Sequence, residues 1–427
     1  MASEEESKID KSALDVPKGW GIRRLDEVAS VIDPWPSHRA PKIFKNGYPY
    51  VGIGDISENG EIEFEKTRKV GESVVLEQES NMLFDDRYIG LGKVGTVGKV
   101  VWVKSKPFRY ALSATMVLIK PTSKINKNFL YYIFKSPNFQ GQISRFMTGT
   151  TRPTIGILTL RTLEIPVPSL EEQLSISKIL SDLDAKIELN QKMNKTLEAI
   201  AQAIFKHWFI DFEFPNEEGK PYKSSGGEMV DSELGEIPKG WKLANFTEEF
   251  VVNMGQSPPG KSYNIEGRGE PFFQGRKDFG ERFPSIRVYC NDPKKFASKG
   301  ETLISVRAPV GDLNKALVDC CIGRGLASIK HASGSLSYTY YTMVSMKSGL
   351  KDFESKGTVF GSISKSDFGE LNVIAPRTSI IQEFEKIIGA FDEVIELNTI
   401  QNRTLEAARD SLLPKLMSGR LRVPLED

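Results

Sequence analysis

A helical stripe of apolar and small residues occurs twice in this chain, at an offset of 208 residues. In each copy the steps between stripe positions alternate between four and three residues, which is the spacing of a helix face that meets a partner helix. The first copy consists of Ile176, Leu180, Leu183, Ile187, Asn190, Asn194, Leu197, Ala201 and Ile204. The second copy consists of Phe384, Ile388, Phe391, Ile395, Asn398, Asn402, Leu405, Arg409 and Leu412. Two long helices that each need a partner predict an intramolecular antiparallel pair.

Each stripe is preceded by a capping-box pattern, Ser169-x-x-Glu in the first copy and Ser379-x-x-Gln in the second. In such a box the side chains bind the free amides at the start of a helix. At ~1.5 Å per residue, each helix would be roughly 50–60 Å long. Arg409 interrupts the second stripe and Pro414 follows it, so we expect the second helix to end differently from the first.

Both stripes contain two asparagines, Asn190 and Asn194 in the first copy and Asn398 and Asn402 in the second. A buried asparagine at a helix–helix contact commonly fixes the register at some expense of stability. An antiparallel pair would place Asn190 near Asn402 and Asn194 near Asn398. A register function is our preferred interpretation, and a partner-binding face is the alternative.

The rest of the chain is duplicated as well. Val-Pro-Lys-Gly-Trp at residues 16–20 returns as Ile-Pro-Lys-Gly-Trp at residues 237–241. Two copies of this length indicate pseudo-twofold symmetry rather than a solenoid. The predicted parts are a disordered lead-in (residues 1–13), a first globular domain (14–168), a first long helix (169–212), a linker with a second globular domain (213–376), and a second long helix with a tail (377–427).

The globular parts are predicted to be rich in β-strands. Short alternating apolar stretches recur around residues 50–53, 99–103 and 114–119, and Gly, Pro and Asn separate them. Residues 128–134 predict a short helix. Residues 211–236 are polar and rich in Gly and Ser, which is typical of a linker. The predicted fold class is α+β, with two β-rich domains in tandem and two long antiparallel helices between them.

Composition excludes several classes of protein. No run of about 18 apolar residues exists, so no membrane span is predicted. The acidic, polar first ten residues do not have the pattern of a secretory signal. Three cysteines are too few for a disulfide framework and indicate a reducing compartment. Neither these cysteines nor the three histidines have a convincing metal-ligand spacing, so no metal is predicted.

The strongest charge signal is a block without acids. Between residues 87 and 161 there are thirteen Lys or Arg residues and no Asp or Glu, although the whole chain carries a net charge of only +1. Many of these cations stand near Gly, Thr, Ser or Pro, which favours exposed loops, and duplex phosphate is the natural partner of such a surface. A solvated surface without acids is the alternative. The candidate DNA-binding residues of both domains are Arg87, Lys93, Lys99, Lys104, Arg109, Arg152, Arg276, Lys277, Arg307, Lys315 and Arg324.

Catalytic motifs are not evident. Residues 92–99 resemble a phosphate-binding loop superficially, but the spacing is wrong and Val100 stands where magnesium requires Ser or Thr. Glu218 and Lys220 lie in the polar stretch, where no fold would hold a metal. No glycine-rich cofactor motif opens a helix after a strand, so no cofactor is predicted. The sequence indicates a binding protein without catalytic residues.

The end of the first long helix is apolar around much of its circumference. Phe205, Trp208 and Phe209 are predicted to pack against something besides the second helix, either a globular domain or another subunit. We assign them as candidate partner-binding residues.

Taken in their order, several short segments resemble the DNA-specificity subunit of type I restriction–modification systems. These segments are residues 237–241, Ile-Pro-Val-Pro at 165–168 leading to Gln173, the turn at Gly149 and Thr150, Trp-Phe-Ile-Asp-Phe at 208–212, and Gly-Gly-Glu-Met-Val at 226–230. The resemblance covers nearly the whole chain.

This resemblance implies two target-recognition domains, each of which binds one half of a split DNA site, and two antiparallel helices that space them. It implies double-stranded DNA, two modification (methyltransferase) subunits and restriction motor–nuclease subunits as partners, in a prokaryotic cytoplasm. Methylation and cleavage would belong to those partners. A protein-binding scaffold without DNA recognition is the alternative function.

Overall fold

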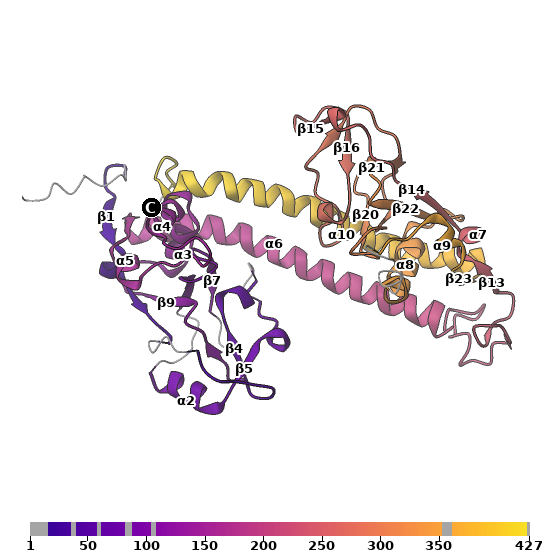
Figure 1. Ribbon diagram of the computed structural model, residues 1–427, viewed down its shortest axis with the longest axis horizontal. Helices are drawn as coiled ribbons and strands as arrows, with labels where there is room; N and C mark the ends of the chain where they lie inside the picture. The colour runs from indigo at the N-terminus through magenta and orange to yellow at the C-terminus, as the bar shows by residue number, and fades with distance from the viewer. Residues whose placement is uncertain are drawn as a thin grey trace, which may run out of the picture. The chain divides into compact units, whose positions relative to one another are not determined.

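The computed structural model describes residues 16–35, 40–57, 61–81, 88–103, 108–351 and 361–424. They form a mixed structure of helices and sheets, as the sequence predicted (Figure 1). Residues before 190 and after 400 make one compact unit, and residues 190–400 make another. We call these the first unit and the second unit. The boundaries differ from the predicted ones because each unit includes part of both long helices.

Two four-stranded sheets form the first unit. One sheet has the antiparallel order β2 (Ala29–Ile32), β9 (Met116–Pro121), β6 (Ile89–Gly92), β7 (Val100–Trp102). The other has the order β3 (Ile43–Phe44), β5 (Arg68–Val70), β4 (Tyr48–Val51), β8 (Ala111–Leu112), in which β4 and β8 are parallel. A separate pair joins β1 (Gly21–Arg24) to β10 (Glu164–Val167).

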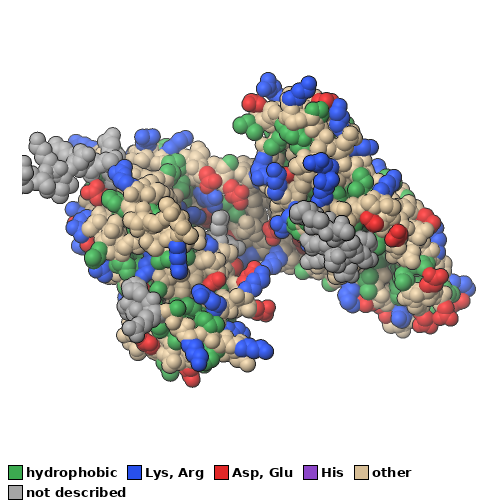
Figure 2. All heavy atoms as spheres, in the orientation of Figure 1, with side chains coloured by type: hydrophobic (Ala, Val, Ile, Leu, Met, Phe, Trp, Pro, Cys, Tyr) green, Lys and Arg blue, Asp and Glu red, His purple; other side chains and the backbone are tan. Residues whose placement is uncertain are grey.

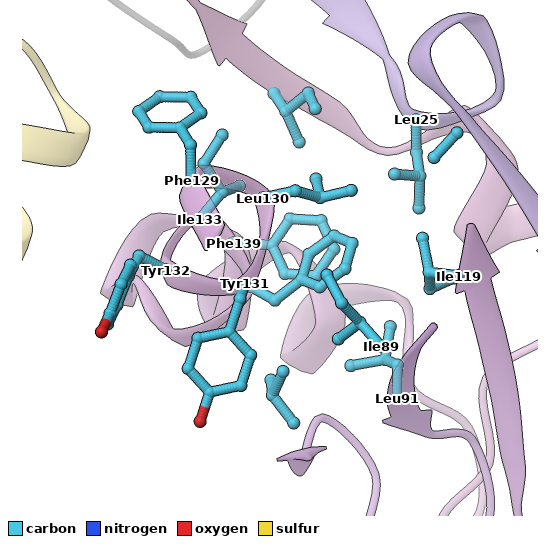
Figure 3. Close-up of a cluster of buried hydrophobic side chains, with 14 of the residues drawn as sticks. Leu25, Ile89, Leu91, Ile119, Phe129, Leu130, Tyr131, Tyr132, Ile133 and Phe139 are labelled. Atoms are coloured by element: carbon cyan, nitrogen blue, oxygen red, sulfur yellow. The ribbon is translucent and has the colours of Figure 1, made fainter. Parts of the chain in front are cut away.

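Helices cover the antiparallel sheet and fill the core of the first unit. The helix predicted at residues 128–134 is confirmed as α3 (Lys127–Lys135), and the Asn126 side chain caps it by accepting a hydrogen bond from the Phe129 amide at 3.0 Å. Leu130 of α3 extends toward Ile119 of β9, whereas Tyr132 points away from β6 and β9 (Figure 3). The other helical segments are α1 (Leu25–Val28), η1 (Ile53–Asp55), η2 (Phe64–Lys66), α2 (Glu72–Asn81), α4 (Pro137–Phe146) and α5 (Ile157–Thr162).

The second unit repeats this strand arrangement. Its antiparallel sheet has the order β14 (Phe250–Met254), β22 (Leu326–His331), β19 (Thr302–Ser305), β20 (Leu313–Lys315). A five-stranded sheet has the order β15 (Tyr263–Asn264), β17 (Tyr289–Cys290), β16 (Glu270–Phe273), β21 (Cys320–Ile322), β18 (Phe296–Ala297). The pairs β11 (Met229–Val230) with β12 (Ile237–Pro238) and β13 (Lys242–Asn245) with β23 (Asn372–Ala375) complete it. Its helical segments are α7 (Phe246–Glu249), η4 (Gly260–Ser262), η5 (Arg276–Asp278), α8 (Leu336–Lys351) and α9 (Lys365–Gly369).

Two long helices carry the duplicated stripe. They are α6 (Leu170–Phe205), followed by a π-helical turn η3 (Lys206–Ile210), and α10 (Thr378–Met417) (Figure 1). In the first unit, Asp184 of α6 binds Arg409 of α10 at 2.8 Å, and the Ile187 carbonyl accepts from the Asn402 side chain at 3.5 Å. Residue numbers in α10 decrease as those of their contact partners in α6 increase, so the two helix segments run antiparallel in this unit.

Two expectations about the helix ends are wrong. Ser379 lies inside α10, which begins at Thr378, so the second capping box does not form. At the first, the Ser169 hydroxyl accepts from the Glu172 amide at 3.3 Å, but the Glu172 carboxylate binds Trp20 at 3.1 Å instead of closing the box. The expectation that the two helices end differently is confirmed: α6 runs into the π-helical turn η3, whereas α10 continues through Pro414 to Met417.

The polar stretch at residues 211–236 begins with two buried aromatic residues. Phe212 and Phe214 are buried in the core of the second unit, and the Phe214 ring stacks on Trp241 with 5.0 Å between ring centroids. The start of the predicted linker therefore belongs to the core of the second unit, whereas most of residues 216–236 are exposed.

In the second unit the Asn398 amide donates to the Asn194 side-chain oxygen at 2.9 Å, which is the contact expected for this register. We predict that replacing both residues by Leu raises the Tm of unfolding, because a polar pair at a helix contact stabilises less than an apolar one, and loosens the register. Calorimetry would measure the first effect. Cysteine crosslinking between neighbouring turns would measure the second, and a lower Tm in the double variant would contradict the prediction.

Candidate nucleic-acid interface

A hydrogen-bonded turn of the same construction joins two strands in each unit. Between β6 and β7, the Gly92 amide donates to the Lys99 carbonyl at 2.8 Å, and Gly98 donates back to Gly92 at 3.0 Å. Between β19 and β20, the Ser305 amide donates to Asp312 at 2.9 Å, and Gly311 donates back to Ser305 at 3.0 Å. Gly98 and Gly311 have φ angles of 82° and 85°, which glycine adopts without strain.

Two further loops meet each of these turns. In the first unit, the Lys93 amide donates to Thr115 at 2.9 Å, and the Ile155 amide donates to Lys93 at 3.0 Å. In the second, Val306 donates to Gly325 and Ile363 donates to Val306, both at 3.0 Å. We call this assembly the three-loop corner. It comprises residues 93–98, 113–115 and 152–156 in the first unit, and 306–311, 323–325 and 361–363 in the second.

The three-loop corner of the first unit borders a cavity of about 920 Å³. Trp35 and Tyr50 contribute aromatic walls, and Thr154 contributes a hydroxyl. Arg68 and Arg152 also line the cavity and are exposed, and within the described part of the chain neither forms an ion pair. The Arg68 guanidinium lies 5.7 Å from the centre of the Tyr50 ring, which orients it without neutralising it. Two free cations beside hydroxyl groups are suited to phosphate oxygens.

In the second unit the corner presents Arg307 and Arg324. Arg307 follows Val306 in the sequence and Arg324 precedes Gly325. The Val306 amide donates to the Gly325 carbonyl, so the backbones at the two arginines are adjacent. Both side chains are exposed and have no ion-pair partner among the residues that the structure describes. Lys and Arg side chains are spread over the face of the second unit that carries β15, β16 and β20 (Figure 2). The side chains of the two corners differ although their backbones correspond.

Two of the predicted cations are buried instead of exposed. Lys93 is 4% exposed and its ammonium binds Asp33 at 2.7 Å. Lys315 is 5% exposed and binds Asp392 at 2.6 Å. The expectation that Lys93 stands on an exposed loop is wrong, and Lys315 is likewise buried, since each is neutralised by a carboxylate far away in the sequence.

Other predicted cations are bound by oxygen atoms of the protein, or they lie outside the described residues. Lys99 is half-buried and donates to the Ile56 carbonyl. Arg109 is exposed but binds Glu79 and, at 3.3 Å, Glu72, and its bond to Glu79 holds its pKa above the ordinary value. Arg276 binds Asp312 at 2.6 Å. Exposed Lys277 lies beside it in η5. Arg87 and Lys104 fall outside the described ranges.

Sequence reasoning missed Arg68, because it precedes the acid-free block. The signal that could have revealed it is the pair Arg68 and Lys69 on β5, opposite the aromatic residue Tyr50 of β4. Tyr50 is buried beneath it.

The predicted partner-binding residues belong to a core. Phe205, Trp208 and Phe209 are only 5–7% exposed and pack within the second unit against Phe384 of α10 and Tyr338 of α8. Their assignment to a partner subunit is wrong. The helix end is apolar on several sides because a globular domain covers it, which was the other explanation of the same pattern.

The described residues include no group of three or more His, Cys, Asp or Glu side chains placed to bind a metal. Cys290, Cys320 and Cys321 are buried thiols, and burial raises the pKa of Cys320 to about 12. None of the helices in the described ranges is long and apolar enough to cross a membrane.

Comparisons with known proteins agree on one family. Residues 17–199 match the model of the type I restriction modification DNA specificity domain. A Methanocaldococcus jannaschii protein named as the specificity subunit of type I restriction enzyme MjaX is 32% identical, and the match covers 98% of each chain. The MjaIX specificity subunit of the same organism is 27% identical over 96% of this chain and 95% of its own.

A solved type I restriction–modification S subunit from M. genitalium has the same fold. Its TM-score is 0.57 at 16% identity, and the match covers 94% of this chain and 96% of that one. The chain therefore belongs to the family of type I restriction–modification DNA-specificity subunits.

Proposed function

We propose that this chain is the non-catalytic subunit that selects the DNA sequence in a type I restriction–modification complex. The observation that carries this proposal is the three-loop corner, which recurs in both units with exposed arginines that have no carboxylate partner in the described ranges. Arginine is the side chain that most often binds phosphate and guanine edges. The corners differ in their side chains, as two different half-sites require.

We further propose that the units form a tandem pseudo-twofold repeat, in which each globular part binds one half of a bipartite target. The antiparallel segments of α6 and α10 are suited to set the distance between the halves. The asparagines of the two stripes would then fix the register of the helices. The hydrogen bond between Asn398 and Asn194 supports this role.

Partner subunits are proposed to dock on the long helices. In the first unit, Ile179 and Leu189 of α6 are 38% and 52% exposed. In the second unit, Ile387 and Leu397 of α10 occupy the same repeat positions and are 41% and 65% exposed. Apolar side chains that stay exposed at corresponding places in both copies favour two copies of one partner. We assign that partner as the modification subunit, with a restriction motor–nuclease subunit joining the complex, in a prokaryotic cytoplasm.

The corner is tested by removing its charge. We expect Arg152→Gln, Arg307→Gln and Arg324→Gln together to weaken binding to every duplex and to lower the salt slope by about 0.9 per lost phosphate contact. Fluorescence anisotropy of the assembled complex across a salt series measures both. Lys18→Gln, which removes an exposed cation outside both the corner and the long helices, is the control.

An unchanged salt slope in the triple variant would place the DNA elsewhere. If the unmodified complex bound no DNA in preference to other polyanions, the protein-binding scaffold would become the better function.

A further inference from the structure

Asp184 of α6 and Asp392 of α10 occupy the same position in the two copies of the repeat, 208 residues apart. Each accepts hydrogen bonds from the globular part of its own unit. In the first unit the donor is the Tyr132 hydroxyl of α3, at 2.7 Å. In the second unit the donors are Lys315, Arg282 and Ser337. The same helix position thus attaches the globular part to the helices in both units.

The attachment in the second unit is a buried cluster of charges. One oxygen of Asp392 accepts from Lys315 at 2.6 Å and from Ser337 at 2.9 Å, and the other accepts from Arg282. Lys315 and Arg282 are 5% and 4% exposed, so water cannot replace the carboxylate. Arg282 also binds Glu198 of α6 at 3.1 Å, so it joins both helices.

The attachment in the first unit is weaker. Among the residues that the structure describes, the globular part offers Asp184 only the neutral hydroxyl of Tyr132, and the cation on Asp184 is Arg409 from α10. The Asp184 side chain is 29% exposed, against 10% for Asp392. Breaking a buried, fully desolvated ion pair is far more disruptive than losing a half-exposed one.

The Asp392 cluster is connected directly to the three-loop corner of the second unit. Lys315 ends β20, and the turn that precedes β20 carries Arg307. Because β19 is paired with β20 on one side and with β22 on the other, a rotation of this sheet about the Lys315 end of the hairpin would displace Arg307. The carboxylate therefore holds the hairpin at one angle to the helices.

We propose that Asp392 is a positioning residue that fixes the orientation of the second recognition surface on the helical pair, and that Asp184 is its weaker counterpart in the first unit. This inference rests on the proposed function. It assigns to Asp392 an effect on the accepted gap between half-sites, although the residue touches no DNA in this scheme.

The test uses the assembled complex with its modification subunits and duplexes that carry the mapped target, with the natural gap or a gap one base pair longer or shorter. We expect Asp392→Asn to lower affinity for the natural gap about tenfold and to reduce its preference over the altered gaps. Preference for the bases within each half-site should remain. Asp184→Asn should change affinity by about threefold or less.

Two matched variants separate positioning from stability. Glu393→Gln removes the same charge from the next, exposed residue of α10 and should behave like the unmodified chain. Asp392→Glu retains the charge and should recover much of the gap preference. Hydrogen exchange of residues 302–315 should accelerate in Asp392→Asn while that of residues 116–121 stays unchanged.

If Asp392→Asn kept the preference of the unmodified complex for the natural gap, the inference would be overturned, whether or not hydrogen exchange of residues 302–315 accelerated. So would equal effects of Asp392→Asn and Glu393→Gln. If the unmodified complex itself showed no preference for the bipartite target, the proposed function would fail instead.

Discussion

Replacing residues 14–168 by the matching domain of another specificity subunit is expected to change one half of the DNA target and to leave the other half and the gap intact. The physical reason is that the whole three-loop corner of the first unit, including Arg152, lies inside this segment. The helices and the second unit remain unaltered. Methylation mapping of a genome exposed to the chimera with its modification subunits would reveal the new target.

The chimera must keep the groups that attach the domain to α6. The Trp20 indole donates to Glu172 at 3.1 Å, the Asn126 backbone N–H donates to the Gln173 side-chain oxygen at 2.7 Å, and the Tyr132 hydroxyl donates to Asp184. A second chimera that lacks the Trp20 and Tyr132 side chains is the control, and we expect its complex to lose DNA methylation without gaining a new half-site. Simultaneous change of both half-sites in the first chimera would show that the units do not recognise DNA separately.

A change in helix length is expected to alter the gap and to spare both half-sites. Removing residues 187–193 and 399–405 takes about two turns from each helix and shortens the pair by about 10 Å. At about 34–36 Å per 10–10.5 base pairs, this corresponds to a gap about three base pairs shorter. Methylation of the natural target should disappear, and mapping should find the same half-sites at the new distance.

An insertion of seven residues after both Leu189 and Ile400 is the matched control, because it lengthens the helices without deleting any side chain. It should lengthen the gap by a similar amount. If both variants kept the natural gap, the helices would not be the element that sets it.

The sequence was sufficient to predict the helices, because their period is local and is repeated. The position of Ile187 or Phe384 in the stripe depends only on neighbours within two turns. The capping boxes were predicted less well. Glu172 stands at the right spacing from Ser169 for a capping box, but its carboxylate accepts a hydrogen bond from Trp20, which is 152 residues away in the sequence. Local rules fail where a tertiary contact satisfies the same group better.

The candidate DNA contacts were harder to predict for the same reason. An acid-free block shows only which cations lack acidic neighbours in the sequence. In the folded chain, Lys93 forms an ion pair with Asp33 at 2.7 Å, and Arg109 forms one with Glu79. Arg152 belongs to the same block but has no ion-pair partner among the described residues. Charge along a chain predicts the composition of a surface, whereas the fold decides which charges are neutralised.

The division of both helices between the units has a consequence for synthesis. The second unit is one continuous segment, residues 190–400, and all of its partners are available once that segment has been made. The first unit includes residues 401–424, whose Leu413, Leu416 and Met417 pack in the core around Phe129. Domains commonly fold in the order in which they are translated, the N-terminal one first. Here the order is reversed: the second unit can close once residue 400 has been made, whereas the core of the first unit is incomplete until residues 413–417 have been added.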